Sequence, residues 1–155
     1  MSRVKGVRSI DVVPTEDDEE ATFSRWLDLN HYTHFHVPQE TYTTSWSAKR
    51  HNKKLGVKRG VPDHWVIVKD KNEVVTLVAI EMKRRSGGKI SDEQFKMISE
   101  LMHCIGLFAF VAYGADDAIN IIREIEADDN EGWTKRARKF KERYTRRMSK
   151  KKEVF

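Results

Sequence analysis

Two carboxylates and a lysine border the most apolar stretches of this sequence. Asp63 precedes the run HWVIV, and Glu81 and Lys83 close the run LVAIEMK. Alternate residues of a strand share one face, so Glu81 and Lys83 point the same way if that run is a strand. A hairpin between the runs would bring Asp63 to them. Carboxylates are the hard ligands that Mg²⁺ and Mn²⁺ prefer, and a neighbouring lysine can act on a water or a phosphate. The set predicts metal-assisted phosphodiester hydrolysis.

A structural interpretation of the same residues competes with the catalytic one. Glu81 and Lys83 could form an ordinary surface salt bridge, with Asp63 capping a turn. A Glu-x-Lys triplet is common by chance, and Pro-Asp followed after 17 intervening residues by Glu-x-Lys is itself a weak signal. The charges do interrupt apolar runs that would otherwise continue. Spacing alone leaves both interpretations open.

The first half of the chain predicts a helix, an edge strand and a hairpin. Acidic residues crowd the start of 14–31, where the helix dipole favours them, and apolar residues follow at helical spacing. The segment 31–40 predicts a short strand, which its proline confines to an edge or an end. The polar, basic segment 41–60 predicts a long surface loop. The β-rich runs 64–68 and 73–83 flank KDKN and predict the hairpin.

The second half predicts a helix, a buried strand and another helix. A Ser-x-x-Gln capping box at Ser91 starts a helix to about residue 105, whose apolar phase includes Cys104 as a core thiol. The apolar run 107–114 is typical of a strand buried on both faces, and 115–127 predicts the last core helix. The order α-β-β-β-α-β-α indicates an α/β sandwich with a mixed sheet and a right-handed parallel crossover.

Composition narrows the class of protein. The chain has 155 residues, of which 39% are hydrophobic and 34% charged, and this is enough for one domain with a core. A single cysteine excludes an internal disulfide framework. No apolar run approaches the roughly 20 residues that span a bilayer, and MSRVKGVRSIDVV lacks the apolar segment of a signal peptide. We expect a soluble protein of the cytoplasm, or of the host cytoplasm if the gene is viral, with no membrane partner.

Charge divides the chain unequally. The net charge is +5, yet residues 131–155 carry eleven Lys and Arg against three Glu, or +8, which leaves −3 for residues 1–130. We expect an irregular arm over 1–14, one domain over 15–130 and a basic amphipathic helix or tail thereafter. The tail could dock on the body or on a second subunit, order only on nucleic acid, or seek an anionic membrane; we favour docking or dimer formation. Its apolar residues recur at intervals of three and four: Trp133, Ala137, Phe140, Tyr144 and Met148.

Basic residues before Asp63 and after Lys83 predict contacts with a polyanion. If the hairpin forms, both groups rim the site and can bind phosphates regardless of sequence. Trp46 and Tyr42 could stack on unpaired bases or simply pack. SGGK lacks the context of a phosphate-binding loop, so we expect no nucleotide cofactor. The candidate DNA-binding residues are Lys53, Lys54, Lys58, Arg59, Arg84, Arg85 and Lys89.

The cluster HYTHFH raises the question of zinc. His34 and His36 would share one face of a strand, but no cysteine or carboxylate completes a ligand set at the usual spacing. His64 adjoins Asp63 and would point the other way on a strand. We therefore predict neither a zinc site nor a ligand role for His64.

In order along the chain, HVPQE, GVPDHWVIV, LVAIEMKRRSGGKISDEQ and AYGADDAINII resemble the VRR-type nuclease family of the PD-(D/E)xK superfamily. The resemblance runs from about Pro14 to Ile122. Gln39 stands where Asn is usual and His64 where an apolar residue is common; neither departure removes a catalytic atom. The resemblance implies a restriction-endonuclease-like α-β-β-β-α-β-α core with a central mixed sheet flanked by helices, to which the tail adds a basic C-terminal helix.

This resemblance assigns roles to the opening residues. It implies a metal held by Asp63 and Glu81, with Lys83 acting on the water or on the scissile phosphate. Gln94 matches a glutamine that supports the site, although it is equally a capping-box residue. The metal would be Mg²⁺, with Mn²⁺ able to substitute.

The resemblance also implies a site glutamate from the first helix. Glu16, Glu19 and Glu20 compete for this role, and periodicity does not decide between them. The spacing to Trp26 matches the family pattern for Glu19, which we choose as the third metal ligand and catalytic residue.

The function implied is that of a Mg²⁺-dependent endodeoxyribonuclease that cuts branched or otherwise structured DNA, as a Holliday junction resolvase does. Two-fold substrates favour a homodimer. One alternative is a non-catalytic nucleic-acid-binding module whose carboxylates are structural. Another is a sequence-specific mobile-element endonuclease with the same chemistry.

Overall fold

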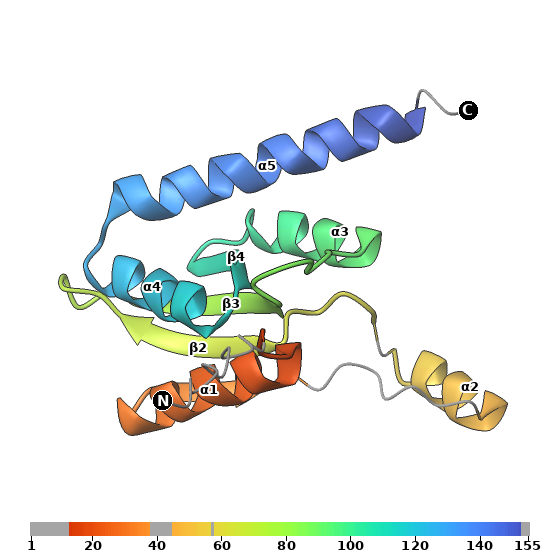
Figure 1. Ribbon diagram of the computed structural model, residues 1–155, viewed down its shortest axis with the longest axis horizontal. Coiled ribbons are helices and arrows are strands. Elements are labelled where there is room, and N and C mark those ends of the chain that lie inside the picture. The colour runs from red at the N-terminus through yellow and green to blue at the C-terminus, as the bar shows by residue number, and fades with distance from the viewer. Residues whose placement is uncertain (1–12, 38–44, 57, 153–155) are drawn as a thin grey trace, which may run out of the picture.

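The computed structural model describes residues 13–37, 45–56 and 58–152, with side chains to residue 150 (Figure 1). The expected arm over 1–14 therefore lies almost entirely outside the described residues, as do Gln39 and Tyr42. Within the described part, no helix combines the length and the apolar character needed to cross a membrane.

A four-stranded mixed sheet forms the centre of the molecule, in the order β1-β2-β3-β4. β1 (Thr33–His36), β2 (His64–Lys69) and β3 (Val75–Lys83) pair antiparallel in succession, and β4 (Leu107–Tyr113) joins β3 in parallel. The predicted hairpin and the predicted strand–helix–strand crossover are both present. The register pairs His64 with Ile80, so Asp63 lies at the end of the hairpin where Glu81 emerges.

Helices cover both faces of the sheet. α1 (Glu16–Leu29) and α4 (Ala115–Glu126) pack on one face, and α3 (Asp92–Leu101) packs on the other. The first core includes Phe23, Leu27, Val66, Ile80, Met82, Phe110, Ile121 and Ile122, and the second is centred on Ala79, Ile98 and Ala109. The period of two along each strand separates these cores, as the α/β prediction requires.

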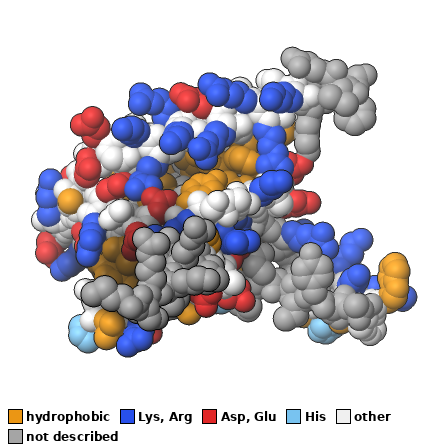
Figure 2. Space-filling view, viewed as in Figure 1, with side chains coloured by type: hydrophobic (Ala, Val, Ile, Leu, Met, Phe, Trp, Pro, Cys, Tyr) orange, Lys and Arg blue, Asp and Glu red, His pale blue; other side chains and the backbone are white. Residues whose placement is uncertain are grey.

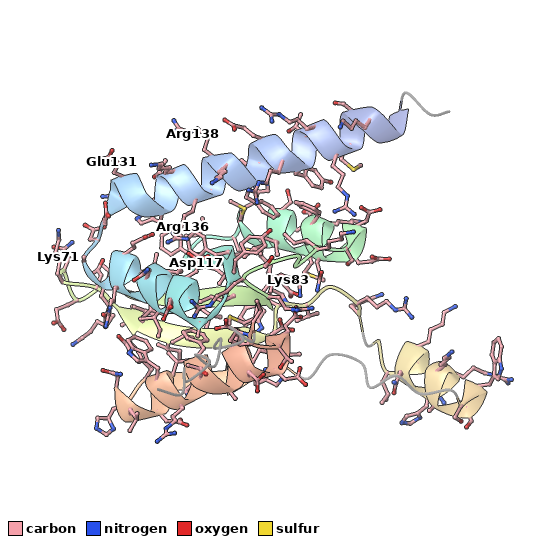
Figure 3. The ribbon with its side chains drawn as sticks, in the orientation of Figure 1. Lys71, Lys83, Asp117, Glu131, Arg136 and Arg138 are labelled. Atoms are coloured by element: carbon pink, nitrogen blue, oxygen red, sulfur yellow. The ribbon has the colours of Figure 1, made fainter. Side chains whose placement is uncertain are left out.

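The basic helix α5 (Asn130–Lys152) contacts the body along much of its length. The Arg136 guanidinium reaches Asp117 Oδ1 at 2.7 Å and forks onto both carboxylate oxygens of Glu124 at 2.7 and 2.9 Å; Figure 3 shows it turned toward α4. On the α3 side, the Phe140 ring lies 5.1 Å from that of Phe95. α5 therefore bridges α4 and α3 past β4.

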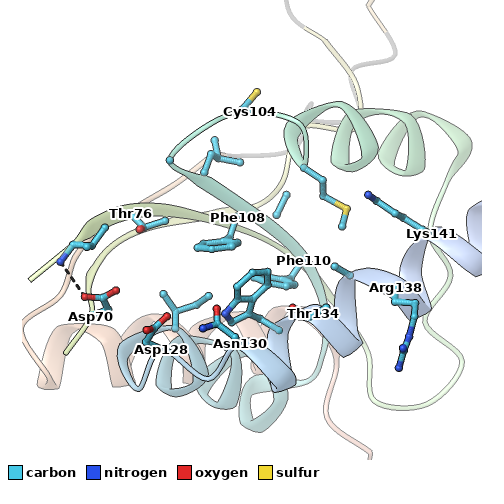
Figure 4. Close-up of a pocket in the computed structure, with 18 of the residues that line it drawn as sticks. Asp70, Thr76, Cys104, Phe108, Phe110, Asp128, Asn130, Thr134, Arg138 and Lys141 are labelled. Carbon is cyan, nitrogen blue, oxygen red and sulfur yellow. Dashed lines mark hydrogen bonds between the residues drawn. The ribbon is translucent and has the colours of Figure 1, made fainter. Parts of the chain in front are cut away.

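An apolar groove of about 1040 Å³ lies between β4 and α5 (Figure 4). Phe108 and Phe110 of β4 and Trp133 of α5 line it, and Arg138 and Lys141 stand at its margin. None of Asp63, Glu81 and Lys83 lines this groove. A search for the active site by cavity volume alone would therefore miss the residues that can do chemistry.

The segment predicted as a long surface loop contains a helix, α2 (Trp46–Lys54). Its nine residues include neither Pro nor Gly, so nothing in them breaks a helix. The prediction failed because α2 has no buried residue and hence no apolar periodicity to reveal it. α2 stands out from the body (Figure 1).

The predicted core position of Cys104 is also wrong, because α3 ends at Leu101 rather than near residue 105. Residues 102–106 form turns, and Gly106 has the positive φ of 74° that favours glycine. Cys104 is therefore an exposed free thiol.

Candidate active site

Asp63, Glu81 and Lys83 meet at one end of the sheet and are almost completely buried, with exposed fractions of 1%, 0% and 5%. The Met82 backbone N–H donates to Asp63 Oδ2 at 3.0 Å, which ties the start of β2 to the end of β3. Lys83 Nζ lies 2.7 Å from Glu81 Oε1. The burial rules out an exposed surface salt bridge as the description of this group.

Lys83 is held by oxygens from two elements. Its Nζ donates to the Met82 carbonyl at 2.7 Å and to Glu16 Oε1 of α1 at 2.9 Å, besides its contact with Glu81. Burial alone would lower the pKa of Lys83, but the carboxylates of Glu81 and Glu16 outweigh it and raise that pKa. Lys83 is therefore an ammonium ion at neutral pH.

Glu81 has one satisfied oxygen and one that lacks a partner. Oε1 accepts from Lys83 and from Gln94, whereas Oε2 is buried and finds no hydrogen-bond partner among the described residues. Burial, reinforced by the charge of Asp63, raises the pKa of Glu81 to about 8. A buried carboxylate oxygen beside a second carboxylate is stabilised by a cation, so Asp63 and Glu81 fit a hard divalent ion such as Mg²⁺.

Gln94 both caps α3 and contacts Glu81. Its backbone N–H donates to Ser91 Oγ at 3.1 Å and its side-chain oxygen accepts from the Ser91 N–H at 2.9 Å, which completes the capping box of α3. Its amide nitrogen donates to Glu81 Oε1. The cap thus fixes the amide that orients Glu81.

Gly60 lets the chain pass closely over the start of α3 before it reaches Asp63. Its φ is +82°, and an added Cβ would lie 2.5 Å from the carbonyl carbon of Glu93 and 2.7 Å from the Gln94 nitrogen. Only glycine combines this backbone conformation with this approach. The contact places Asp63 and Gln94 in one rigid unit.

The glutamate chosen from α1 does not lie with the other site residues. Glu19 is 3% exposed and accepts from Arg85 Nε at 2.6 Å and from the Ala115 N–H, at the start of α4, at 2.7 Å. Gly114 leaves the space for this contact, because a Cβ there would lie 2.6 Å from Arg85 Cγ. Glu19 thus links α1 to the start of α4 and to the segment that follows β3.

Glu16 and Glu20 are the α1 carboxylates that approach the site. Glu16 pairs with Lys83, and burial followed by the charge of Asp63 raises the pKa of the half-buried Glu20 to about 7. The two are four residues apart and so share a helix face, but Glu19 is three residues from Glu16 and both Glu19 and Glu20 lie on the side of Phe23. Spacing therefore could not single out Glu20, and only the contacts of Glu19 with Arg85 and Ala115 separate it from the site.

The candidate DNA-binding residues occupy three different settings. Lys53 and Lys54 are exposed on α2, which projects from the body, rather than at the mouth of the site. Arg85 forms ion pairs with Glu19 and, at 2.9 Å, with Asp116, so its main role is structural. The exposed basic residues next to the site in sequence are Lys58, Arg59, Arg84 and Lys89. Figure 2 shows further Lys and Arg side chains along α5 and around α2.

Comparison with family models gives no match, and comparison with curated proteins gives none either. A solved structure described as a "VRR_NUC domain protein" is similar to this chain, with a TM-score of 0.55 and 26% sequence identity; the match covers 73% of this chain and 88% of that one. The fold is that of the restriction-endonuclease-like class, and the likeness indicates a nuclease domain of the PD-(D/E)xK type. Within this class, the structural likeness supports the resemblance of the ordered motifs to the VRR-type nuclease family.

Proposed function

We propose that this protein is a Mg²⁺-dependent endodeoxyribonuclease, with Mn²⁺ able to replace Mg²⁺. The observation that carries the proposal is the buried Glu81 Oε2, which lacks a partner among the described residues beside Asp63 and the Lys83 ammonium. A purely structural cluster would leave a buried carboxylate oxygen unsatisfied at considerable cost. In a cation-binding site the ion would satisfy this oxygen, so the arrangement would favour cation binding.

Asp63 and Glu81 would hold the ion, which supplies Lewis acidity and lowers the pKa of a bound water. Gln94 and Lys83 keep Glu81 in one orientation through its other oxygen. The raised pKa of Lys83 favours electrostatic stabilisation of the charge that develops on the phosphate over proton abstraction. Glu16 holds the lysine from the α1 side.

We infer a DNA substrate from the family likeness, and a branched or structured one from the resemblance in the motifs. The exposed basic residues of α2 and α5 suit phosphate contacts outside the site itself. Trp46, which is 77% exposed at the start of α2, suits stacking on unpaired bases.

A homodimer belongs to the same proposal. β4 is an end strand of the sheet formed by the described residues, and the apolar groove beside it offers Phe108, Phe110 and Trp133. A two-fold assembly would present two sites to a two-fold junction. Light scattering on the purified chain should give twice the monomer mass. A cytoplasmic location, the last part of the proposal, suits the exposed thiol of Cys104.

The proposal is tested by incubating the protein with labelled four-way junction, flap, single-stranded and linear duplex DNA in Mg²⁺, Mn²⁺ or EDTA. We expect cutting in either metal, none in EDTA, and the fastest cutting of the junction. Cutting of one duplex sequence alone would contradict the structural selectivity. Binding to DNA without cutting in any metal would leave a nucleic-acid-binding module and overturn the enzymatic proposal.

A further inference from the structure

His64 is a buried polar side chain that the proposed hydrolysis does not use. It is 1% exposed, and neither its Nδ1 nor its Nε2 finds a hydrogen-bond partner within the described residues. It alternates with Asp63 and faces the α1 side of the sheet, where the Phe23 ring packs edge-on at 5.4 Å. A buried imidazole ordinarily hydrogen-bonds through at least one nitrogen, so this site lacks a partner for it.

Two further ligand-type side chains converge on His64. His36 is its cross-strand neighbour in the β1–β2 pair, and the two ring centroids lie 4.9 Å apart. Glu20 reaches the same point from α1, and one potential ligand atom from each of the three residues lies within 4.8 Å of the others. Ligands of one metal ion at about 2.0–2.2 Å from it are separated by less than twice that distance, so small side-chain movements suffice.

The burial of the three residues suits a site that is open on one side. His64 forms its floor, Glu20 is half-buried and His36 is exposed. The cluster unites α1, β1 and β2, residues far apart in the sequence, which is why the spacing within HYTHFH gave no zinc signature. His34 cannot replace His36 without losing the 2.8 Å contact of its Nε2 with Asp28.

We propose that Glu20, His36 and His64 form a second metal site that takes Zn²⁺ or a similar late transition-metal ion. Two imidazoles and one carboxylate select such an ion over Mg²⁺, and three protein ligands leave a coordination position for water. The oxygen pair of Asp63 and Glu81 has the opposite preference. The proposal does not depend on nuclease activity, because its three ligands do not include Asp63, Glu81 or Lys83, although Glu20 also lies near Asp63.

Co²⁺ is the probe, since its visible absorption reports bound nitrogen ligands where Zn²⁺ is silent. The full-length protein without a histidine tag, freed of metal with EDTA, is titrated with Co²⁺ in the presence of excess Mg²⁺. We expect visible bands that saturate at one Co²⁺ per chain, persist in Mg²⁺ and disappear when Zn²⁺ is added. Bands that Mg²⁺ abolishes would overturn the proposal.

Variants assign the ion to its ligands. His36→Gln alters an exposed side chain and should leave the fold intact while weakening Co²⁺ binding at least tenfold; His64→Phe, checked for its melting temperature, should do the same. His103→Gln, at an exposed position in the turn after α3, is the matched control and should bind Co²⁺ as the parent does.

Asp63→Asn separates this inference from the proposed nuclease function. It should remove Mg²⁺-dependent cutting and leave the Co²⁺ bands in place. Co²⁺ bands that survive both histidine substitutions, or that Asp63→Asn removes, would show that the ion occupies the carboxylate site and would overturn the second site.

Discussion

Replacing Glu81 by Gln should stabilise the metal-free protein while removing the proposed activity. Glu81 is fully buried beside Asp63, and its pKa is raised from 4.5 to about 8. The folded carboxyl therefore holds its proton more tightly than the unfolded one. Its contribution to stability is fully present below about pH 4.5 and is lost as the pH rises to about 8. The amide of Gln cannot ionise, so the variant escapes this loss, and its oxygen can still accept from Lys83 and Gln94.

The size of the gain follows from the pKa difference. A pH of 7 is about 2.5 units above the pKa of glutamate in the unfolded chain, and each unit corresponds to about 1.4 kcal/mol. The free energy of unfolding of Glu81→Gln should therefore exceed that of the parent by roughly 3 kcal/mol. For a chain of this length, that corresponds to an increase in Tm of roughly 6–12 °C. Near pH 4.5 the two proteins should be almost equally stable.

Urea unfolding in EDTA at about pH 4.5, 6 and 7.5 measures this difference across the window in which it should grow. Glu100→Gln, on the exposed face of α3, is the matched control and should show no growing gain. A Glu81→Gln variant that is less stable than the parent at every pH would refute the reasoning. It would mean that Glu81 is ionised in the folded state and that its ion pair with Lys83 stabilises the protein.

Three further substitutions test contacts that hold the site or the fold together. Gly60→Ala should push the segment before Asp63 away from α3, lower the free energy of unfolding by about 1–3 kcal/mol and remove most of the activity. Gly56 has a similar φ but open space around it, so Gly56→Ala is the control. It should lower the free energy of unfolding in urea by less and leave cutting intact. Arg136→Ala should lower the free energy of unfolding by about 1–3 kcal/mol and expose α5 to protease, unlike Arg138→Ala on the exposed face. Glu19→Gln should lower stability and leave metal affinity, measured by calorimetry, nearly unchanged; a tenfold loss of affinity would restore Glu19 as a ligand.

The sequence was most informative where structure depends on local periodicity. β2 and β3 are neighbours in the chain, so the alternation of apolar residues and a short turn were enough to place Asp63 beside Glu81. The capping box of α3 likewise needed only Ser91 and Gln94. The continuous apolar run of β4 predicted a strand buried on both faces, but β4 is an end strand of the described sheet and only Ala109, Phe110 and Ala112 of it are buried. Its parallel pairing with β3 follows from the intervening helix.

Long-range contacts escaped prediction because no local pattern encodes them. Glu19 is distinguished from its neighbours by Arg85 and by the Ala115 N–H, which are remote in the sequence. α2 has no buried face, so its helix leaves no hydrophobic signal. The meeting of Glu20, His36 and His64 depends on how α1 lies across the β1–β2 pair.

Cleavage by Lys83→Ala tests the central claim most directly, with Lys69→Ala, an exposed lysine paired to Glu73, as its control. Both variants and the parent are incubated with four-way junction DNA in Mg²⁺, and their binding is measured by gel shift in Ca²⁺. We predict that Lys83→Ala binds the junction as the parent does and cuts at least a hundredfold more slowly, while Lys69→Ala does both normally. Parental cutting by Lys83→Ala would contradict the assignment of Asp63, Glu81 and Lys83 as a nuclease site.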